Sequence, residues 1–496
     1  MARMLLTHGT VVTMDAERRI IPDGAVLIEA GRIVRADRAS AFDPNALGDV
    51  KVVDCSGKLI LPGFIDAHAH AGHTMNRALG WDTRSFWMAY MEKIYHHHTT
   101  PGYWYAEGRL AALERLKAGI TLGVSVLTNA QRADDPRIAV ENSRGYGAVG
   151  NRQIVAVGPS NPPYPRGFHQ YREGRWESVS LTFDEIMTKT EEAIELVNGT
   201  FDGRIQAFIA PFVLVGSVEP SGPTPADRAV KLTDLDRKMM RAVREIASRQ
   251  KTRIHTEAFG GMIRLAKQSD DALLGPDVHL QHCKGISFDE ALILAETGTH
   301  VTTTPAWGQY VTRCPVPELL GLGVNVAATT DGVAPGIPYD LIQAVRNLAM
   351  IQQGALNDFY YLPPGKMLSM ITIDAARAVG REHDLGSIEP GKLADLITVD
   401  MRQPHLAPTH LPVHTLMLYG NAADVADVMV EGRWVMRGRQ VLTVDEAEVL
   451  RDAAEESSAA IRRAGLETRL SERHELEKPE RLDGVGLFTV LDLELK

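Results

Sequence analysis

Two histidines, His68 and His70, stand two positions apart at the end of the run 61–70, Leu-Pro-Gly-Phe-Ile-Asp-Ala-His-Ala-His. Side chains alternate between the two faces of a strand, so both imidazoles are expected on one face. Two imidazoles on one face can bind a single divalent metal ion. The motif alone is weak evidence, because most isolated surface histidines are only solvated. A metal site therefore requires further ligands from other strands.

Candidate ligands follow other short apolar runs later in the chain. His255 and Glu257 stand two apart, so both side chains are expected on the same face of one strand. His279 and His282 stand three apart, and only one of them can face that way in a regular strand. Asp331 closes a further run and precedes a glycine-rich loop. These residues can meet only if the fold brings several strand ends to one place.

Eight short β-rich runs alternate with helical segments in the middle of the chain. The β runs are residues 63–70, 119–127, 152–158, 204–212, 252–258, 278–283, 300–305 and 325–331. Segments between them carry apolar residues at helical spacing, and Thr233 and Ser287 precede acidic residues as N-terminal caps do. Eight β-α repeats predict an α/β protein built on a (β/α)8 TIM barrel. In such a barrel the chemistry lies at the C-terminal strand ends, where the histidines and carboxylates stand.

The two ends of the chain are β-rich and suggest a second domain. Residues 1–60 and 386–442 are predicted to form one small β-sandwich from both chain ends, flanking a barrel of residues 61–385. Residues 443–496 are expected to form a helical and extended tail, as a surface or subunit-contact arm. The alternative is that the two β-rich pieces are unrelated.

Four of the candidate residues can form a metal site of the catalytic type. His68, His70, His255 and Asp331 supply three nitrogens and one oxygen to one divalent ion, and an open position remains for water. Zn²⁺ is preferred, with Fe²⁺ as the alternative. Such an ion lowers the pKa of its water to about 7. Asp331, His282 and Glu257 are the predicted catalytic residues, whereas His279 is expected to be structural.

The same motifs resemble the amidohydrolase superfamily. The run 61–70, a histidine in the fifth strand, His282 in Gln-His-Cys and Asp331 in Thr-Thr-Asp-Gly match its pattern, and residues 386–400 resemble its return to a flanking β-sandwich. The likeness covers about residues 1–440 and is greatest to the cytosine deaminase and triazine hydrolase branch, which is usually mononuclear. Binuclear relatives carry a carboxylated lysine on the fourth strand. The run 204–212 contains no lysine, so the resemblance implies one ion.

One departure from that branch bears on the reaction. Deaminating relatives usually have a glutamate three residues after the fifth-strand histidine, where it passes protons to a ring nitrogen. Here Ala258 stands at that position and Glu257 lies one residue earlier. This departure counts against ring deamination, although Glu257 could act from another angle. Within the superfamily the chain therefore most resembles phenylurea and molinate hydrolases.

The predicted substrate-binding residues are Trp87, Tyr90, His97 and Trp307. They belong to loops after the first and seventh strands, which reach the barrel mouth, and their aromatic character suggests an apolar or aromatic substrate. The alternative is that these aromatic residues only pack the loop against its own helix. The run 96–98 is interpreted as a solvated helix turn, with His97 as the member that could touch substrate. Residues 158–177 are expected to form a surface loop at the rim.

Composition excludes several other classes of function. The 53 basic and 63 acidic residues give a net charge of −10, which argues against binding nucleic acid or an anionic membrane. The three cysteines are far apart and odd in number, as in a protein of the reducing cytoplasm. No run of 18 apolar residues and no signal-like N-terminus is present, so a cytoplasmic location is expected. The long tail predicts a homo-oligomer.

These observations predict a hydrolase acting on carbon–nitrogen bonds other than peptide bonds. In the main hypothesis, metal-activated water attacks the carbonyl of an amide, urea or carbamate-like small molecule. His282 orients the water or stabilises the oxyanion, and Asp331 with Glu257 passes a proton to the leaving amine. The alternative is an aminohydrolase or dechlorinase acting on a heteroaromatic ring. A non-catalytic scaffold is the remaining alternative, and the complete ligand set argues against it.

Overall fold

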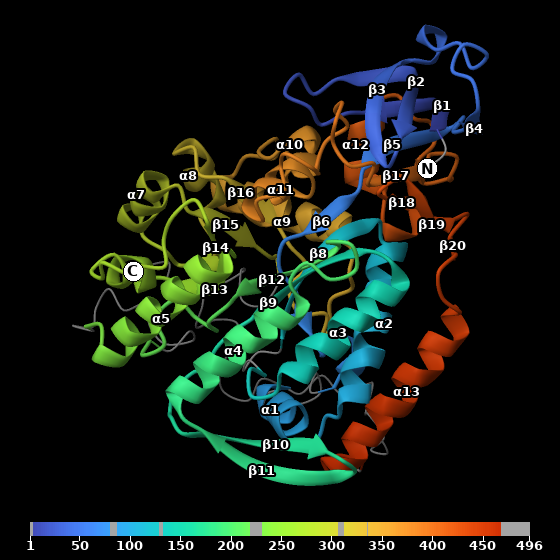
Figure 1. Cartoon of the computed structure of the whole chain (residues 1–496). Coiled ribbons are helices and arrows are strands. Elements are labelled where there is room, and N and C mark those ends of the chain that lie inside the picture. Colours follow the sequence, from blue (N-terminus) through green and yellow to red (C-terminus); the bar gives the residue numbers. More distant parts are fainter. Residues whose placement is uncertain are drawn as a thin grey trace, which may run out of the picture.

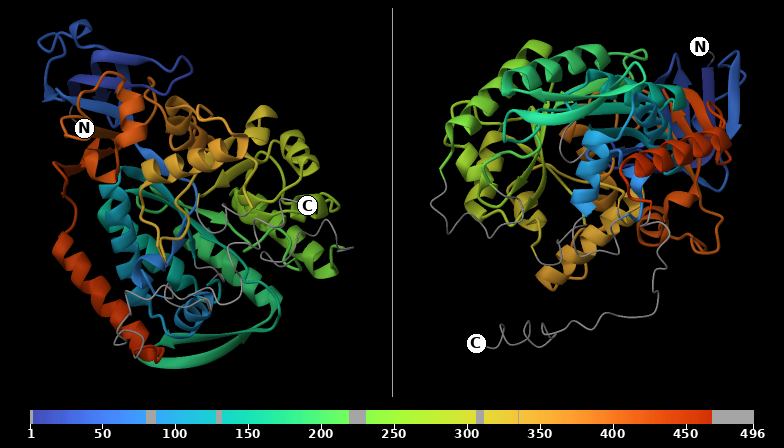
Figure 2. Two further views of the ribbon diagram at one scale, coloured as in Figure 1. Left: turned by 180° about the vertical axis from the view of Figure 1, so that it is seen from behind. Right: turned by 90° about the horizontal axis from the view of Figure 1, so that it is seen from below.

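The computed structural model describes residues 3–79, 87–127, 132–218, 231–305, 312–334 and 336–467, apart from the side chains of residues 87–90 and 92. It contains a barrel wrapped by helices, with a β-rich domain to one side (Figures 1 and 2). Among the described residues no helix has the length and apolar character needed to cross a bilayer.

All eight predicted β runs are present as barrel strands, and their pairs are parallel. Their order around the sheet follows the chain, as a (β/α)8 barrel requires. The strands are β6 (Phe64–Asp66), β7 (His70–Ala71), β8 (Ile120–Leu127), β9 (Arg152–Val157), β12 (Ile205–Ile209), β13 (Ile254–Phe259), β14 (Val278–Lys284), β15 (His300–Thr303) and β16 (Val326–Ala328). The predicted TIM barrel is thereby confirmed.

The first barrel strand differs from the regular strand that the sequence suggested. It is divided into β6 and β7, and residues 67–69 between them are not in strand conformation. Gly63 allows the chain to enter the barrel, since a Cβ there would lie 2.2 Å from Oγ1 of Thr121 on β8. Despite the break, His68 and His70 converge, and their ring centroids are 4.9 Å apart.

Helices surround the barrel and shield both its wall and its rim. They are α1 (Trp87–His97), α2 (Pro101–Lys117), α3 (Pro136–Val149), α4 (Phe183–Val197), α5 (Asp234–Gln250), α6 (Met262–Ala266), α7 (Phe288–Thr297), α8 (Val316–Gly321), α9 (Leu341–Leu356), α10 (Pro364–Met370), α11 (Ile373–Ala378) and α12 (Pro412–Tyr419). The predicted caps at Thr233 and Ser287 are present as reciprocal capping boxes with Asp236 and Glu290. Each box satisfies backbone donors at a helix start.

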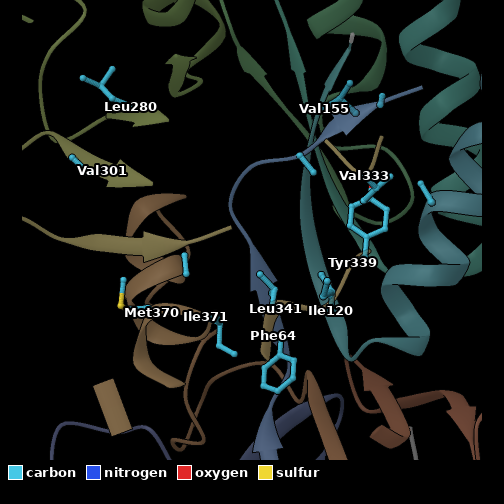
Figure 3. Packing of buried hydrophobic residues seen from close by; sticks show 14 of the residues in the cluster. Phe64, Ile120, Val155, Leu280, Val301, Val333, Tyr339, Leu341, Met370 and Ile371 are labelled. Atoms are coloured by element: carbon cyan, nitrogen blue, oxygen red, sulfur yellow. The ribbon is translucent and has the colours of Figure 1, made fainter. Parts of the chain in front are cut away.

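Buried apolar side chains fill two layers, one on each side of the barrel wall. Outward-facing residues such as Phe64, Ile120 and Val155 pack under the helices (Figure 3). Their neighbours along the strands, including Ile65 and Ile154, form a separate cluster. Parallel strands covered on both faces are expected to be apolar throughout, and every residue of β8 is buried.

The β-rich domain joins the two ends of the chain in one sheet. Its strands are β1 (Arg3–Val12), β2 (Ile20–Glu29), β3 (Arg32–Arg38), β4 (Val50–Asp54), β5 (Lys58–Pro62), β17 (Leu396–Asp400), β18 (Val425–Val430), β19 (Arg433–Arg437) and β20 (Gln440–Val441). Antiparallel pairing of β5 with β17 links the two ends. The β-rich domain built from both termini is confirmed, whereas the boundaries at residues 60, 385 and 442 stay predictions.

Two peripheral elements pack on the outside of the barrel. Residues 158–177 are expected to form a surface loop at the rim, but from Arg166 on the chain forms a hairpin of β10 (Arg166–Arg172) and β11 (Arg175–Leu181). The predicted tail helix is present as α13 (Glu446–Arg463), and it packs along α2 of the same chain (Figure 1). Arg109 on α2 forms ion pairs with Glu448 and Asp452 of α13. This described part of the tail is therefore held against the barrel of its own chain.

Candidate metal centre

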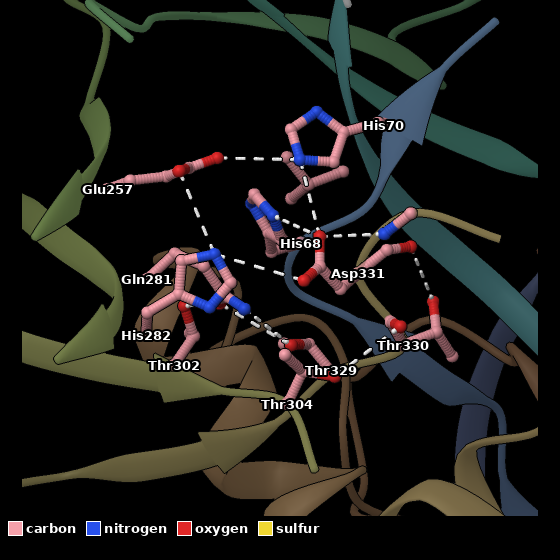
Figure 4. Close-up of polar contacts among 12 residues, drawn as sticks. His68, His70, Glu257, Gln281, His282, Thr302, Thr304, Thr329, Thr330 and Asp331 are labelled. Atoms are coloured by element: carbon pink, nitrogen blue, oxygen red, sulfur yellow. Dashed lines mark hydrogen bonds and ion pairs between the residues drawn. The ribbon is translucent and has the colours of Figure 1, made fainter. Parts of the chain in front are cut away.

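Side chains from four barrel strands or strand ends converge at the mouth of the barrel (Figure 4). Oδ1 of Asp331 lies 3.3 Å from Nε2 of His68 and 3.2 Å from Nε2 of His70. On the facing wall, Nε2 of His282 lies 3.7 Å from Oε2 of Glu257 and 3.8 Å from Oδ2 of Asp331. All five side chains are buried. The structure thus brings together these predicted site residues, which are far apart in the sequence.

Unusual backbone conformations turn two of these residues into the site. His282, Cys283 and Asp331 have positive φ angles of 71°, 47° and 63°. Such left-handed conformations cost a residue with a side chain roughly 1–2 kcal/mol and persist where surrounding contacts hold them. The backbone N–H of Asp331 donates to the carbonyl of His68 over 3.1 Å, which ties the eighth strand to the first. The backbone is therefore strained at the two strand ends that direct His282 and Asp331 into the site.

The backbone turn at His282 breaks the alternation of side chains expected along this strand. Because the backbone departs from strand geometry there, both His279 and His282 lie inside the barrel, rather than one of them. His279 stacks on His255 with ring centroids 4.4 Å apart and donates from Nε2 to the carbonyl of Ala67. His279 therefore holds the ring of His255 in place by stacking against it.

His255 contacts the cluster through His68. Its Nε2 lies 2.8 Å from Nδ1 of His68, on the opposite side of that ring from the nitrogen that faces Asp331. Two groups of three ligand atoms converge within 4.8 Å: one comes from His68, His70 and Asp331, and the other from His68, Glu257 and His282. His255 belongs to neither group, so its predicted role as a ligand stays a prediction.

The charges of the site call for a cation. Burial opposes the charged forms of Asp331 and Glu257, but the neighbouring imidazoles outweigh it and hold the pKa of both carboxyls below their usual values. Burial also opposes protonation of His70, yet Asp331 and Glu257 raise the pKa of that imidazole to about 9. Burial lowers the pKa of His282 to about 4. Within the described residues these two buried carboxylates form ion pairs with His68, His70 and His282, and the positive charge of Lys284 also acts on both carboxylates.

The geometry of the first group of atoms fits a divalent ion. Nitrogen and oxygen ligands bind zinc at about 2.0–2.1 Å, so neighbouring ligands of a tetrahedral ion lie about 3.4 Å apart. The 3.2 and 3.3 Å separations around Oδ1 of Asp331 match that spacing. The residues present therefore fit a resident divalent cation.

Of the predicted substrate-binding residues, only His97 has a described side chain. It lies at the end of α1 against the hairpin, with its ring 4.6 Å from that of His169 on β10. The side chains of Trp87 and Tyr90, and all of Trp307, lie outside the described residues. These assignments stay predictions.

The expectation of a solvated histidine turn at residues 96–98 is wrong for His96. Its side chain is buried and stacks on Phe168 of the hairpin. Burial, reinforced by the positive charges of Arg132 and Arg166, holds the pKa of this imidazole well below its usual value. The hairpin of β10 and β11 covers the face of α1 expected to be exposed to solvent.

Sequence reasoning missed His73, whose ring packs against the ring of His70 in the site. Its ring stacks on His70 at 4.8 Å and on Tyr95 at 6.2 Å, so three parallel rings stand in a row. Gly332 makes room for it, because a Cβ there would lie 2.1 Å from Nδ1 of His73. The signal in the sequence was the spacing of His73 three residues after His70, on the same local turn.

Comparison with known proteins assigns the overall class. The sequence pattern of the amidohydrolase family matches residues 59–435. The chain is 29% identical over 440 residues to a 5-methylthioadenosine/S-adenosylhomocysteine deaminase of Desulforudis audaxviator, covering 87% of this chain and 93% of that protein. It is 26% identical over 484 residues to a 5'-deoxyadenosine deaminase of Methanococcoides burtonii, covering 93% and 99%.

Solved structures share the fold. An adenosine deaminase from Xanthomonas campestris with bound zinc has a TM-score of 0.75 at 22% identity, over 92% of this chain and 98% of the other. The atrazine chlorohydrolase TrzN from Arthrobacter aurescens TC1, complexed with zinc, also has a TM-score of 0.75, at 19% identity and over 92% and 100%. The predicted superfamily and its triazine hydrolase neighbours are confirmed. The finer resemblance to phenylurea and molinate hydrolases has no support among these relatives, which are deaminases by name.

Proposed function

Because the chain belongs to the amidohydrolase family, we propose that it is a metal-dependent hydrolase that deaminates an amino-substituted heteroaromatic ring. The substrate class that we infer is a purine nucleoside of the adenosine type. Names of the curated relatives favour this ring chemistry over the amide, urea or carbamate hydrolysis that the sequence suggested first.

The position of Glu257 is the observation that carries the proposal. The sequence-based argument against deamination was that this glutamate stands one residue too early after His255. In the folded chain its carboxylate nevertheless reaches the centre, 3.4 Å from Nε2 of His70 and 3.7 Å from Nε2 of His282. A carboxyl group at this point can exchange a proton with a ring nitrogen of a bound substrate. The altered spacing therefore does not remove the proton shuttle that deamination needs.

The proposed reaction divides proton transfers between two carboxylates. Water adds its oxygen to the ring carbon that bears the amino group, and Glu257, ionised at rest, accepts one proton of that water and passes it to the adjacent ring nitrogen. Asp331 accepts the remaining proton of the added hydroxyl and passes it to the amino nitrogen as the carbon–nitrogen bond breaks. Ammonia leaves and the ring keeps the oxygen as a carbonyl. His282, which faces both carboxylates, orients the water.

We further propose that one divalent ion, Zn²⁺ in preference to Fe²⁺, is held by His68, His70, His255 and Asp331. When bound, the ion supplies the Lewis acidity that makes water a nucleophile near neutral pH. The short separations around Oδ1 of Asp331 support the first two histidines and the aspartate as ligands.

A homo-oligomer also remains a proposal, supported by the exposed aromatic side chains of Phe359 and Tyr360.

Hydrolysis of an acyclic amide or urea is the second candidate. Ala258 favours it, because this buried residue leaves no carboxylate at the third position after His255, where deaminating relatives have one. An acyl carbon needs no proton at a ring nitrogen, so it would place less demand on Glu257. The two candidates share the metal centre and differ in their substrates.

A substrate panel distinguishes the two reactions. Purified zinc-loaded protein is incubated with adenosine, 5'-deoxyadenosine, 5-methylthioadenosine and S-adenosylhomocysteine, with aminopyrimidines and aminotriazines, and with aryl ureas and anilides. Ammonia release with loss of the adenine absorbance supports the proposal. Arylamine release from the ureas, with no ammonia from the ring amines, overturns it in favour of the second candidate. An Asp331→Ala variant prepared in parallel controls for deaminases carried over from the expression host.

A further inference from the structure

The barrel has a seam between its first and last strands. The sheet runs from β6 at one edge to β16 at the other, and among the described residues no backbone ladder pairs these two edges. The same two edges carry the ligand group of His68, His70 and Asp331. The relative position of those three side chains therefore depends on what joins the seam.

A side chain joins the seam in place of a ladder. The carboxylate of Asp66, at the end of β6, accepts a hydrogen bond from the backbone N–H of Thr330 over 3.1 Å. Its other oxygen accepts from the hydroxyl of Thr330 over 2.6 Å. One residue further on, the N–H of Asp331 donates to the carbonyl of His68. Asp66 stands two residues before His68, and Thr330 stands one residue before Asp331.

The charge of Asp66 is balanced from outside the barrel wall. Asp66 has no solvent exposure, and a buried carboxylate is costly unless it is paired. Nη2 of Arg115 on α2 lies 3.4 Å from it, and this guanidinium also donates to Ser125, Tyr146 and the carbonyl of Val124. Gly123 on β8 opens the wall for it, because a Cβ there would lie 2.3 Å from Nη1 of Arg115.

We infer that Asp66 and Thr330 form a clamp, balanced by Arg115, that positions Asp331 against His68 and His70 and thereby sets the affinity of the site for its metal ion. Three observations support this role together: both oxygens of Asp66 are used on one residue, the clamp is wholly buried, and the residue that it holds precedes a strained left-handed aspartate. Left-handed backbone at a residue with a side chain persists only where neighbouring contacts over-determine it. Thr330 and Asp66 are positioning residues, since neither belongs to the proposed ligand set.

Removing one hydroxyl tests the clamp. Thr330→Val keeps the shape of the side chain and deletes the hydroxyl bond to Asp66, while the bond from the backbone N–H remains; Thr330→Ser retains the hydroxyl. The matched control is Thr190→Val on α4, which deletes an equally buried threonine hydroxyl bonded only to the carbonyl of Ile186. Thr330→Ala serves as the second variant in case the valine does not fold. The measurements are zinc affinity of the metal-free protein by chelator competition, and the melting temperature with and without zinc.

We expect Thr330→Val to weaken zinc binding roughly 10–100-fold, as changes to residues that orient metal ligands do. Thr330→Ser should bind zinc as tightly as the unchanged protein. Thr190→Val should also keep that affinity, although it should lower the melting temperature of the metal-free protein by about as much as Thr330→Val does. An unchanged zinc affinity in Thr330→Val or Thr330→Ala would overturn the inference. So would an equal loss in Thr190→Val, because the effect would then be one of general stability.

This inference rests on the proposed assignment of Asp331 as a metal ligand, so Asp331→Ala is measured in the same series. If zinc affinity falls in Asp331→Ala but not in the Thr330 variants, the clamp is refuted and the metal assignment stands. If zinc affinity is unchanged in Asp331→Ala as well, the metal assignment itself fails.

Discussion

Replacement of Glu257 by glutamine probes the proposed chemistry with little change of shape. Glutamine has almost the volume of glutamate, so it should fit the same space beside His70 and His282. It cannot carry a proton between water and substrate. It also removes one of the two buried negative charges that face the histidines of the site. The variant therefore separates proton transfer from the binding of metal and substrate.

The expected loss follows from the role assigned to this carboxylate. A positioned acid or base contributes roughly 10²–10⁴-fold to the rate, which corresponds to about 3–5 kcal/mol of transition-state stabilisation. Both oxygens of Glu257 lie within 4 Å of an imidazole nitrogen at the centre of the site, and the residue is buried. Water has little room to replace the lost proton carrier, so we expect the upper part of that range. The loss should appear in kcat, with KM within a few-fold of its original value.

The assay measures ammonia release from the best nucleoside of the panel, beside zinc content and thermal melting of each variant. Glu245→Gln on α5, an exposed position, is the matched control and should retain full activity. Full activity of Glu257→Gln would refute the shuttle role. Loss of zinc from Glu257→Gln would refute it in another way, because it would make Glu257 a ligand together with His68 and His282.

Three further outcomes are expected. His255→Ala should lose metal and activity together, as measured by elemental analysis and turnover; retention of both would remove His255 from the ligand set. Asp395→Asn should lower the free energy of urea unfolding by about 3–5 kcal/mol, because it breaks the buried bidentate pair with Arg152 (2.8 and 3.2 Å) that joins β9 to the β-rich domain; an unchanged midpoint would contradict this. His96 stays neutral when folded but takes up a proton below pH 6.5 when unfolded, so stability should fall on acidification below pH 6.5 by up to about 1.4 kcal/mol per pH unit. His96→Phe keeps the stacking and should flatten this slope between pH 7 and 5.5, and an equal slope in both proteins would refute the assignment.

Much of the fold could be predicted because the spacing of apolar residues agrees with the positions of turn and helix-capping residues along the chain. Short apolar runs followed by capped amphipathic segments predict a parallel barrel, and such a barrel gathers its strand ends at one mouth. That geometry alone made His68, His70, Glu257, His282 and Asp331 neighbours, and the structure places them within contact of one another.

Other features depend on tertiary contacts that no local pattern contains. The hairpin of β10 and β11 buries His96, which a local reading of three consecutive histidines leaves in water. The left-handed backbone at His282 brings both histidines of β14 inside, against simple alternation. Local spacing also suggested that Glu257 was displaced from its working position, whereas the end of β13 presents its carboxylate to the site. In the first two cases a long-range contact or a strained turn overrides the helix or strand period, whereas at Glu257 the strand period itself holds.

The metal content of the purified protein tests the central claim most directly. Elemental analysis of the unchanged chain and of His68→Ala and Asp331→Ala, after removal of loosely bound ions, gives the stoichiometry and the identity of the ion together. We predict about one divalent ion per chain, chiefly zinc, in the unchanged protein and almost none in either variant. A metal-free chain that hydrolyses its substrate at full rate, or variants that keep their ion, would contradict the account.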